Sequence, residues 1–147
     1  MNELISLLKS KNRCLRKLLQ YSEHFLTEAS NSADEKNLEL VLELEKKRDI
    51  AIRTLDLIER KINEVAGAIP KIERTPVRLG QVDALVQEAV ETVHEIVITD
   101  GLVLRKVEAI QNEVSKNLLH SKRQQDTIGK FKSSWLSESG SELDKKL

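Results

Sequence analysis

The sequence predicts an all-α protein: an elongated antiparallel, coiled-coil-like bundle of three long helices followed by a polar C-terminal tail. Three observations predict this fold. Good helix formers dominate, while Leu, Ile and Val are too abundant for a disordered chain. Apolar residues recur at steps of three, four or seven along most of the chain. Both prolines, Pro70 and Pro76, fall in one stretch near the middle, so the helical pattern is interrupted there.

Residues 1–66 are predicted to form an antiparallel helical hairpin. The first helix covers about residues 2–30, and the polar run 30–34 supplies turn and N-cap chemistry, because short polar side chains accept hydrogen bonds from first-turn N–H groups. The second helix covers about 33–66, and the charged run 45–49 interrupts its apolar stripe. Since the turn has only a few residues, the two helices must be neighbours.

Residues 67–81, which hold both prolines, are predicted to be a non-helical connection, because each proline removes a backbone N–H and disfavours helix before it. Helical spacing then continues over 82–130, which predicts a third helix of roughly 70 Å. Within it, residues 96–104 are β-branched around an Asp-Gly pair, which is a hairpin signal. We expect helix, because a lone hairpin is marginal, with Gly101 as the position for a kink or break. Residues 131–147 are expected to form a tail that is flexible or ordered by a client.

Composition and charge exclude several classes of protein. The 24 basic residues balance 24 acidic ones, which argues against nucleic acid as the main partner. The longest apolar run is three residues, so we expect no membrane insertion, and the first residues lack the apolar core of a signal peptide. A single cysteine, Cys14, cannot form an internal disulfide and fits a reducing, cytoplasmic location.

No catalytic or metal-binding pattern is apparent in the sequence. Glu91 and His94 form one Glu-x-x-His unit, but a di-iron bundle needs two of these units and further glutamates. We therefore predict no enzymatic activity, no metal and no cofactor. Cys14 is expected to be a small apolar filler in the core.

Charge is distributed unevenly within the neutral total. Residues 82–104 carry five acids and no Lys or Arg, whereas residues 105–132 carry seven bases against three acids. We favour pairing with oppositely charged faces of the other helices over an oriented docking surface. A basic cluster in the first helix (Lys9, Lys11, Arg13, Arg16, Lys17) is interpreted as a solvated face, in preference to a contact with nucleic acid or a membrane surface.

Three features occur in a particular order along the chain. The second helix carries the charged break 45–48 followed by Ile-Arg-Thr-Leu at 52–55. The third carries Asp100 followed by Val-Leu-Arg-Lys-Val at 103–107, and the end reads Lys-Phe-Lys-Ser-Ser at 130–134, then a polar spacer, then Leu-Asp-Lys-Lys at 143–146. Over essentially its whole length the chain thus resembles the flagellar export chaperones of the FlgN/FliT type.

The resemblance implies a cytoplasmic, non-catalytic chaperone. Such proteins bind hook-associated subunits of the filament junction or cap, prevent their premature assembly and deliver them to the type III flagellar export gate. The family's tyrosine, which engages the cytoplasmic domain of the gate, aligns with Phe131. A phenyl ring keeps the stacking surface but lacks the hydroxyl.

Client binding is expected to use the apolar stripe of the third helix. An amphipathic client helix would lie on this stripe, with tail residues covering it. The predicted contact residues are Val103, Val107, Ile110, Val114, Leu118, Phe131, Trp135 and Leu136. Two alternatives stay open: an oligomeric coiled-coil scaffold that uses the same stripe for self-association, and a regulatory adaptor that binds a partner helix.

Overall fold

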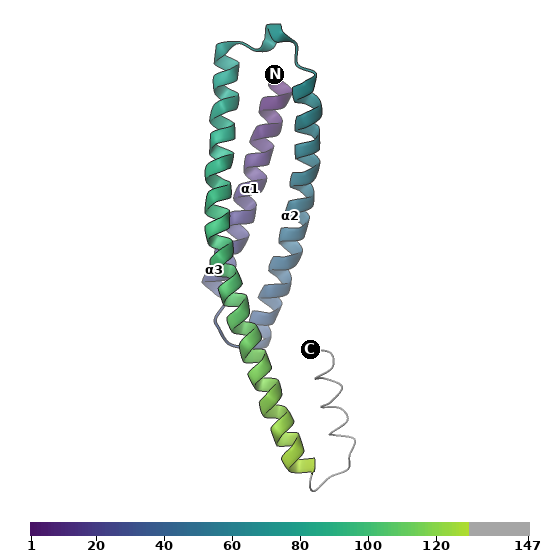
Figure 1. Cartoon of the computed structure of the whole chain (residues 1–147), viewed down its shortest axis with the longest axis vertical. Helices are drawn as coiled ribbons and strands as arrows, with labels where there is room; N and C mark the ends of the chain where they lie inside the picture. The colour runs from purple at the N-terminus through teal and green to yellow at the C-terminus, as the bar shows by residue number, and fades with distance from the viewer. Residues whose placement is uncertain (130–147) are drawn as a thin grey trace.

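The structure, a computed structural model, describes the backbone of residues 1–129 and the side chains of residues 1–120. These residues form α1 (Asn2–Glu28), α2 (Glu35–Gly67), the short 3₁₀ helix η1 (Lys71–Glu73) and α3 (Pro76–Gly129), and no strand occurs among them. Helix α1 packs against both α2 and α3, whereas α2 and α3 scarcely contact each other (Figure 1). The predicted all-α antiparallel bundle is therefore confirmed.

The turn between α1 and α2 has the capping chemistry that the sequence predicts. The Asp34 side chain is the N-cap of α2 and accepts a hydrogen bond from the Asn37 backbone N–H at 2.9 Å. Asn37 is itself buried, and its side-chain amide donates to the backbone carbonyls of Ser30 and Ser32 at 3.1 and 2.9 Å. The turn is thus held by two side chains at the start of α2.

The second connection is shorter than predicted, because α3 begins at Pro76 and not at residue 82. Proline is favoured in the first turn of a helix, where its missing N–H would have no partner and its φ already fits. Thr75 precedes it and acts as a cap: its hydroxyl accepts from the Arg78 N–H at 3.3 Å and its carbonyl from the Leu79 N–H at 2.9 Å. Pro76 therefore starts a helix in place of breaking one.

Residues 96–104 are helical, as expected, and the hairpin alternative is wrong. Helix α3 runs without a break through Gly101 for 54 residues, or roughly 80 Å. In Figure 1 its axis changes direction about half-way along, and it continues well past the turn that joins α1 and α2. No helix in the described part of the chain combines the length and apolar character needed to cross a membrane.

The core consists of three apolar clusters stacked along α1. The cluster near the α2–α3 connection contains Leu4 and Leu8, the middle one centres on Leu15 and Leu18, and the one near the α1–α2 turn centres on Phe25. Because α1 contributes to all three clusters, it is the central helix against which the other two are placed.

Candidate helix-binding groove

The predicted client-binding stripe of α3 is largely occupied by the protein's own core. Val103 is buried and Ile110 is only 1% exposed, in the cluster formed by Phe25 and Leu44. Val107 and Val114 are half-buried against the same cluster, and Leu118 is also half-buried. This face of α3 is therefore not a free surface, because α1 and α2 already cover most of it. The other three predicted contacts, Phe131, Trp135 and Leu136, lie outside the described residues.

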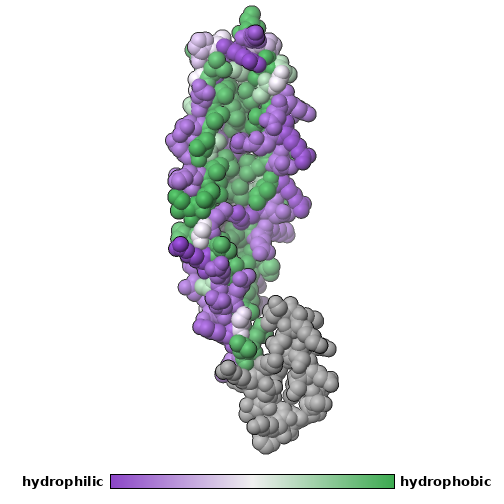
Figure 2. All heavy atoms as spheres, viewed as in Figure 1, coloured by the Kyte–Doolittle hydropathy of each residue, from purple (hydrophilic) through white to green (hydrophobic). Residues whose placement is uncertain are grey.

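A different apolar surface of α3 is open. Four exposed valines follow each other at steps of four, three and four residues, so they share one face of the helix. They are Val86, Val90, Val93 and Val97. Val86, Val90 and Val93 line hollows beside α1 in the gap between α2 and α3, where Figure 2 shows an apolar band along the molecule, and Val97 continues the same helix face.

The gap is a groove, which we name the α2–α3 groove. One hollow of about 220 Å³ lies between Leu8 of α1 and the valines 86, 90 and 93 of α3. A second, of about 450 Å³, lies between Leu15 of α1, Ile52 and Leu55 of α2, and Val93. Val93 and Lys11 line both hollows, so the two hollows adjoin. The α2–α3 groove thus has an α1 floor and walls from the other two helices.

An ion pair closes the end of this groove nearer the α1–α2 turn. Arg48 of α2 donates to both carboxylate oxygens of Asp100 of α3, at 2.7 and 3.0 Å. The same guanidinium donates to the buried hydroxyl of Ser22 on α1 at 3.1 Å. This contact joins all three helices, and it explains the charged interruption in the apolar stripe of α2. Beyond it, Leu44 and Val103 meet in the closed part of the core.

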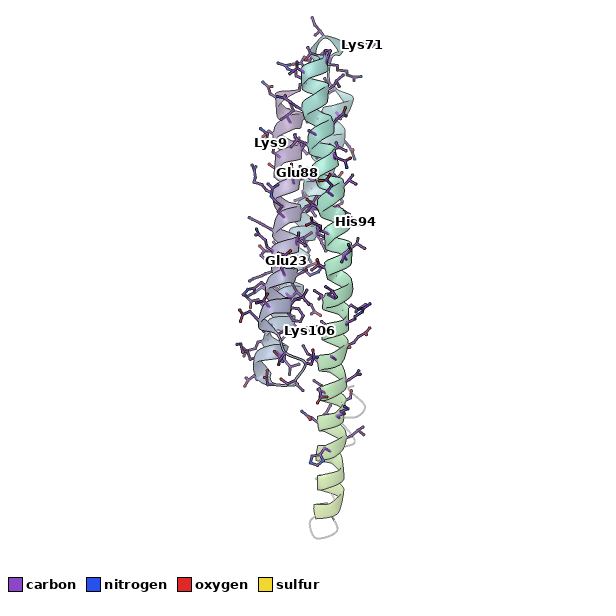
Figure 3. All side chains as sticks on the ribbon, turned by 90° about the vertical axis from the view of Figure 1, so that its left-hand side faces the viewer. Lys9, Glu23, Lys71, Glu88, His94 and Lys106 are labelled. Carbon is purple, nitrogen blue, oxygen red and sulfur yellow. The ribbon has the colours of Figure 1, made fainter. Side chains whose placement is uncertain are left out.

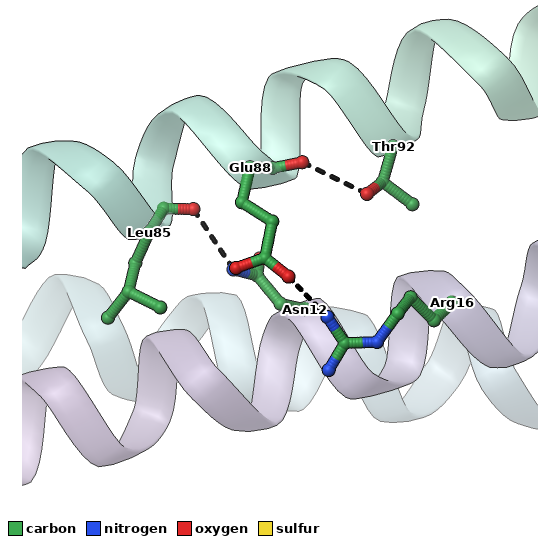
Figure 4. A network of polar contacts seen from close by, with 5 residues as sticks. All are labelled: Asn12, Arg16, Leu85, Glu88 and Thr92. Atoms are coloured by element: carbon green, nitrogen blue, oxygen red, sulfur yellow. Dashed lines mark hydrogen bonds and ion pairs between the residues drawn. The ribbon is translucent and has the colours of Figure 1, made fainter.

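A second polar network fixes the α1–α3 interface beside the groove (Figure 4). Asn12, only 2% exposed, donates from its side-chain amide to the Leu85 carbonyl at 3.0 Å and to Glu88 at 3.2 Å. Arg16 pairs with the other carboxylate oxygen of Glu88. A buried amide of this kind favours one register of two helices, because any slip leaves it without partners.

Residues that could carry chemistry do not converge. His24 and His94 are exposed on different helices, and Figure 3 shows His94 pointing away from α1. Among the described side chains, no group of three His, Cys, Asp or Glu could hold a metal ion. Cys14 lies in the middle core cluster, where its thiol donates to the Ala51 carbonyl at 3.4 Å. Burial raises the pKa of this thiol and Lys17 opposes the rise, so the reactive thiolate is disfavoured.

Helical spacing alone does not predict the open valines, because it places the apolar residues of α3 on a single stripe. The signal was a repeated pair of adjacent apolar residues, at 89–90, 96–97 and 103–104. The first member of each pair is buried and the second is exposed. Such pairs every seven residues indicate an apolar face of the helix that is wide enough to pack against two neighbouring helices.

Comparisons of the chain with protein-family models, with curated proteins and with solved structures gave no match.

Proposed function

We propose that this protein is a flagellar type III export chaperone that holds an amphipathic helix of a hook-associated subunit in the α2–α3 groove. The observation that carries the proposal is the row of exposed valines on α3 beside an α1 floor of Leu8, Lys11 and Leu15. Val90 alone leaves 57% of its surface exposed. Contiguous apolar surface of this kind is typical of protein-binding sites.

A helix is the element that fits this surface. The groove has two helical walls and a helical floor, so one further helix would complete a four-helix bundle. The groove-facing valines at steps of four, three and four match a partner that presents its own apolar residues at i, i+3, i+4 and i+7. Binding here leaves the core contacts of Val103 and Ile110 intact.

The length of the groove limits the partner. Its apolar wall runs from about Val82 to the ion pair at Asp100, or roughly 27 Å along α3. A client helix of about five turns would fill that length, and a longer one would meet the Arg48–Asp100 pair. The proposal therefore concerns one helix of the client and not its whole surface.

Delivery to the export gate rests on the resemblance. In this proposal Phe131 contacts the cytoplasmic domain of the gate through its ring, while Trp135 and Leu136 cover the bound client. The tail then links binding and delivery in one chain. A deletion of residues 130–147 would remove all three of these residues.

The test is a pull-down from a flagellated bacterium with the tagged full-length protein and with a Val90→Asp/Val93→Asp variant. We expect the intact protein to recover a hook-associated subunit and the variant to lose it, because two carboxylates would face the apolar side chains of the client. The matched control is Ile72→Asp/Val77→Asp, which alters two exposed apolar residues away from the groove and should keep the subunit. Recovery of the protein alone, as an oligomer, would favour the scaffold alternative.

A further inference from the structure

The basic cluster of α1 is divided by the structure into paired and unpaired cations. Lys11 pairs with Glu59 of α2, and Arg16 pairs with Glu88 of α3. Lys9, Arg13 and Lys17 have no carboxylate within ion-pairing distance in the described part of the chain. Two of the five cations therefore hold the bundle together, and three do not.

The three unpaired cations form a row on the outer face of α1. Their spacing of four residues places them on one side of the helix, about 6 Å apart along its axis. Figure 3 places Lys9 on the side of α1 opposite α3, and therefore away from the α2–α3 groove. Like charges at this spacing destabilise a helix, so the row does not stabilise the fold.

Two cations of this row, Arg13 and Lys17, border a hollow between α1 and α2. The hollow has a volume of about 310 Å³, and Arg13, Lys17 and Lys47 lie at its rim. Its floor contains Cys14 and Ala51, and its α2 side carries Ile50, which is 58% exposed. The feature therefore combines positive charge with an apolar floor. We name the hollow, together with the row of cations beside it, the basic groove, and define it by Lys9, Arg13, Lys17, Lys47 and Ile50. Lys9 does not line the hollow itself and lies one helical turn from Arg13.

We propose that the basic groove binds an acidic amphipathic helix of a second protein, distinct from the client in the α2–α3 groove. Carboxylates four residues apart on such a helix would match the spacing of Lys9, Arg13 and Lys17. An apolar side chain between them would enter the hollow above Cys14 and contact Ile50. The two grooves lie on different sides of α1, so both partners could be bound together.

The residues around the basic groove favour a protein partner over a nucleic acid or an anionic membrane surface. The aromatic ring that lines the basic groove, that of Tyr21, lies 5.4 Å from the Lys47 ammonium and is not free to stack on a base. The cations border a concave hollow with an apolar floor, whereas adsorption to a flat membrane surface would use a convex face. A helix with one acidic and one apolar side satisfies both parts of the site.

The test uses the full chain and a fluorescent acidic peptide of about 16 residues, with Glu at every fourth position and Leu on the adjoining face. Fluorescence anisotropy should show that the affinity for the peptide falls as the salt concentration rises. The affinity should also be about tenfold lower in Lys9→Gln/Arg13→Gln/Lys17→Gln. The same peptide with Gln in place of Glu should bind poorly. Ile50→Ser should also weaken binding, because the apolar contact is lost.

The matched control is Lys36→Gln/Lys71→Gln/Lys116→Gln, which removes the same charge from three exposed lysines elsewhere and should leave affinity unchanged. Equal affinity of wild type and the α1 triple variant would overturn the proposal, as would equal loss in the control. Tighter binding of RNA, or of phosphatidylserine vesicles, with the same dependence on the three cations would also overturn it. Val90→Asp/Val93→Asp should not affect the peptide, so failure here is distinguishable from failure of the proposed function.

Discussion

The guanidinium of Arg48 on α2 and the carboxylate of Asp100 on α3 form a two-hydrogen-bond ion pair, with distances of 2.7 and 3.0 Å. Both side chains are half-buried, and the pair also holds Ser22 of α1. It is a direct polar link between two helices that otherwise scarcely contact each other. This pair, together with the packing of both helices on α1, sets the position of α2 relative to α3 and hence the width of the groove between them.

Replacing Arg48 with Met should therefore destabilise the protein. We expect a loss of about 1–2 kcal/mol, because Asp100 would lose a charge-assisted bidentate partner in a half-buried site. Urea denaturation followed by circular dichroism measures this change. Arg53→Met is the control, since its pair with Asp49 is largely exposed and should contribute less than about 0.5 kcal/mol. Equal effects of the two variants would show that the Arg48 pair is not a special link.

Gly101→Ala should stabilise the protein by about 0.5–1 kcal/mol. The glycine lies inside α3, and a Cβ there would meet no atom within 4 Å. Alanine has the higher helix propensity and restricts the unfolded chain. The same denaturation experiment checks it, with Gly80→Ala as a second open helical position. A destabilised Gly101→Ala variant would indicate that the helix is broken at this residue.

Ile110→Ala should destabilise the protein by about 2–4 kcal/mol, because the side chain fills the cluster around Phe25. Val97→Ala should change stability by less than about 0.5 kcal/mol, since that side chain is 64% exposed. Thermal unfolding of both variants distinguishes the two apolar faces of α3. Similar losses from the two variants would mean that the valine face is also covered.

We expect the stability of the folded protein to depend on pH in the alkaline range because of the Cys14 thiol. Burial raises its pKa in the folded protein, so the unfolded chain ionises first as the pH increases. This contribution to stability is complete below the ordinary thiol pKa and is lost as the pH rises through it toward the raised folded value. Denaturation midpoints across that range should fall more steeply for wild type than for Cys14→Ala. Parallel curves would contradict the burial.

Much of the fold could be predicted because it is encoded locally. The helices follow from apolar spacing, and the α1–α2 turn from the short polar side chains of 30–34, in which Asp34 became the N-cap. The start of α3 was predicted six residues too late, because a proline such as Pro76 can either end a helix or occupy its first turn. Its cap, Thr75, was the distinguishing signal.

The α2–α3 groove was harder to predict, because it depends on which helix packs against each face of α3. Ile96 and Val97 are adjacent in sequence and equally apolar, yet one is buried against α1 and the other is exposed at the groove. Spacing gives the width of an apolar arc but not its division between a core and an open surface. In the same way, Lys11 and Lys9 are identical residues two positions apart, yet Lys11 lies at the groove and pairs with Glu59 of α2, whereas Lys9 is exposed on the outer face of α1.

The most direct test of the proposed function is a calorimetric titration with a peptide that spans an amphipathic helix of a hook-associated subunit. We expect saturable binding to the full-length protein, and a loss of about a hundredfold or more in affinity for Val90→Asp/Val93→Asp. We also expect unchanged affinity for Ile72→Asp/Val77→Asp, with helix content retained in both variants. Unchanged affinity in the groove variant would contradict the account, because the client would then bind at another surface.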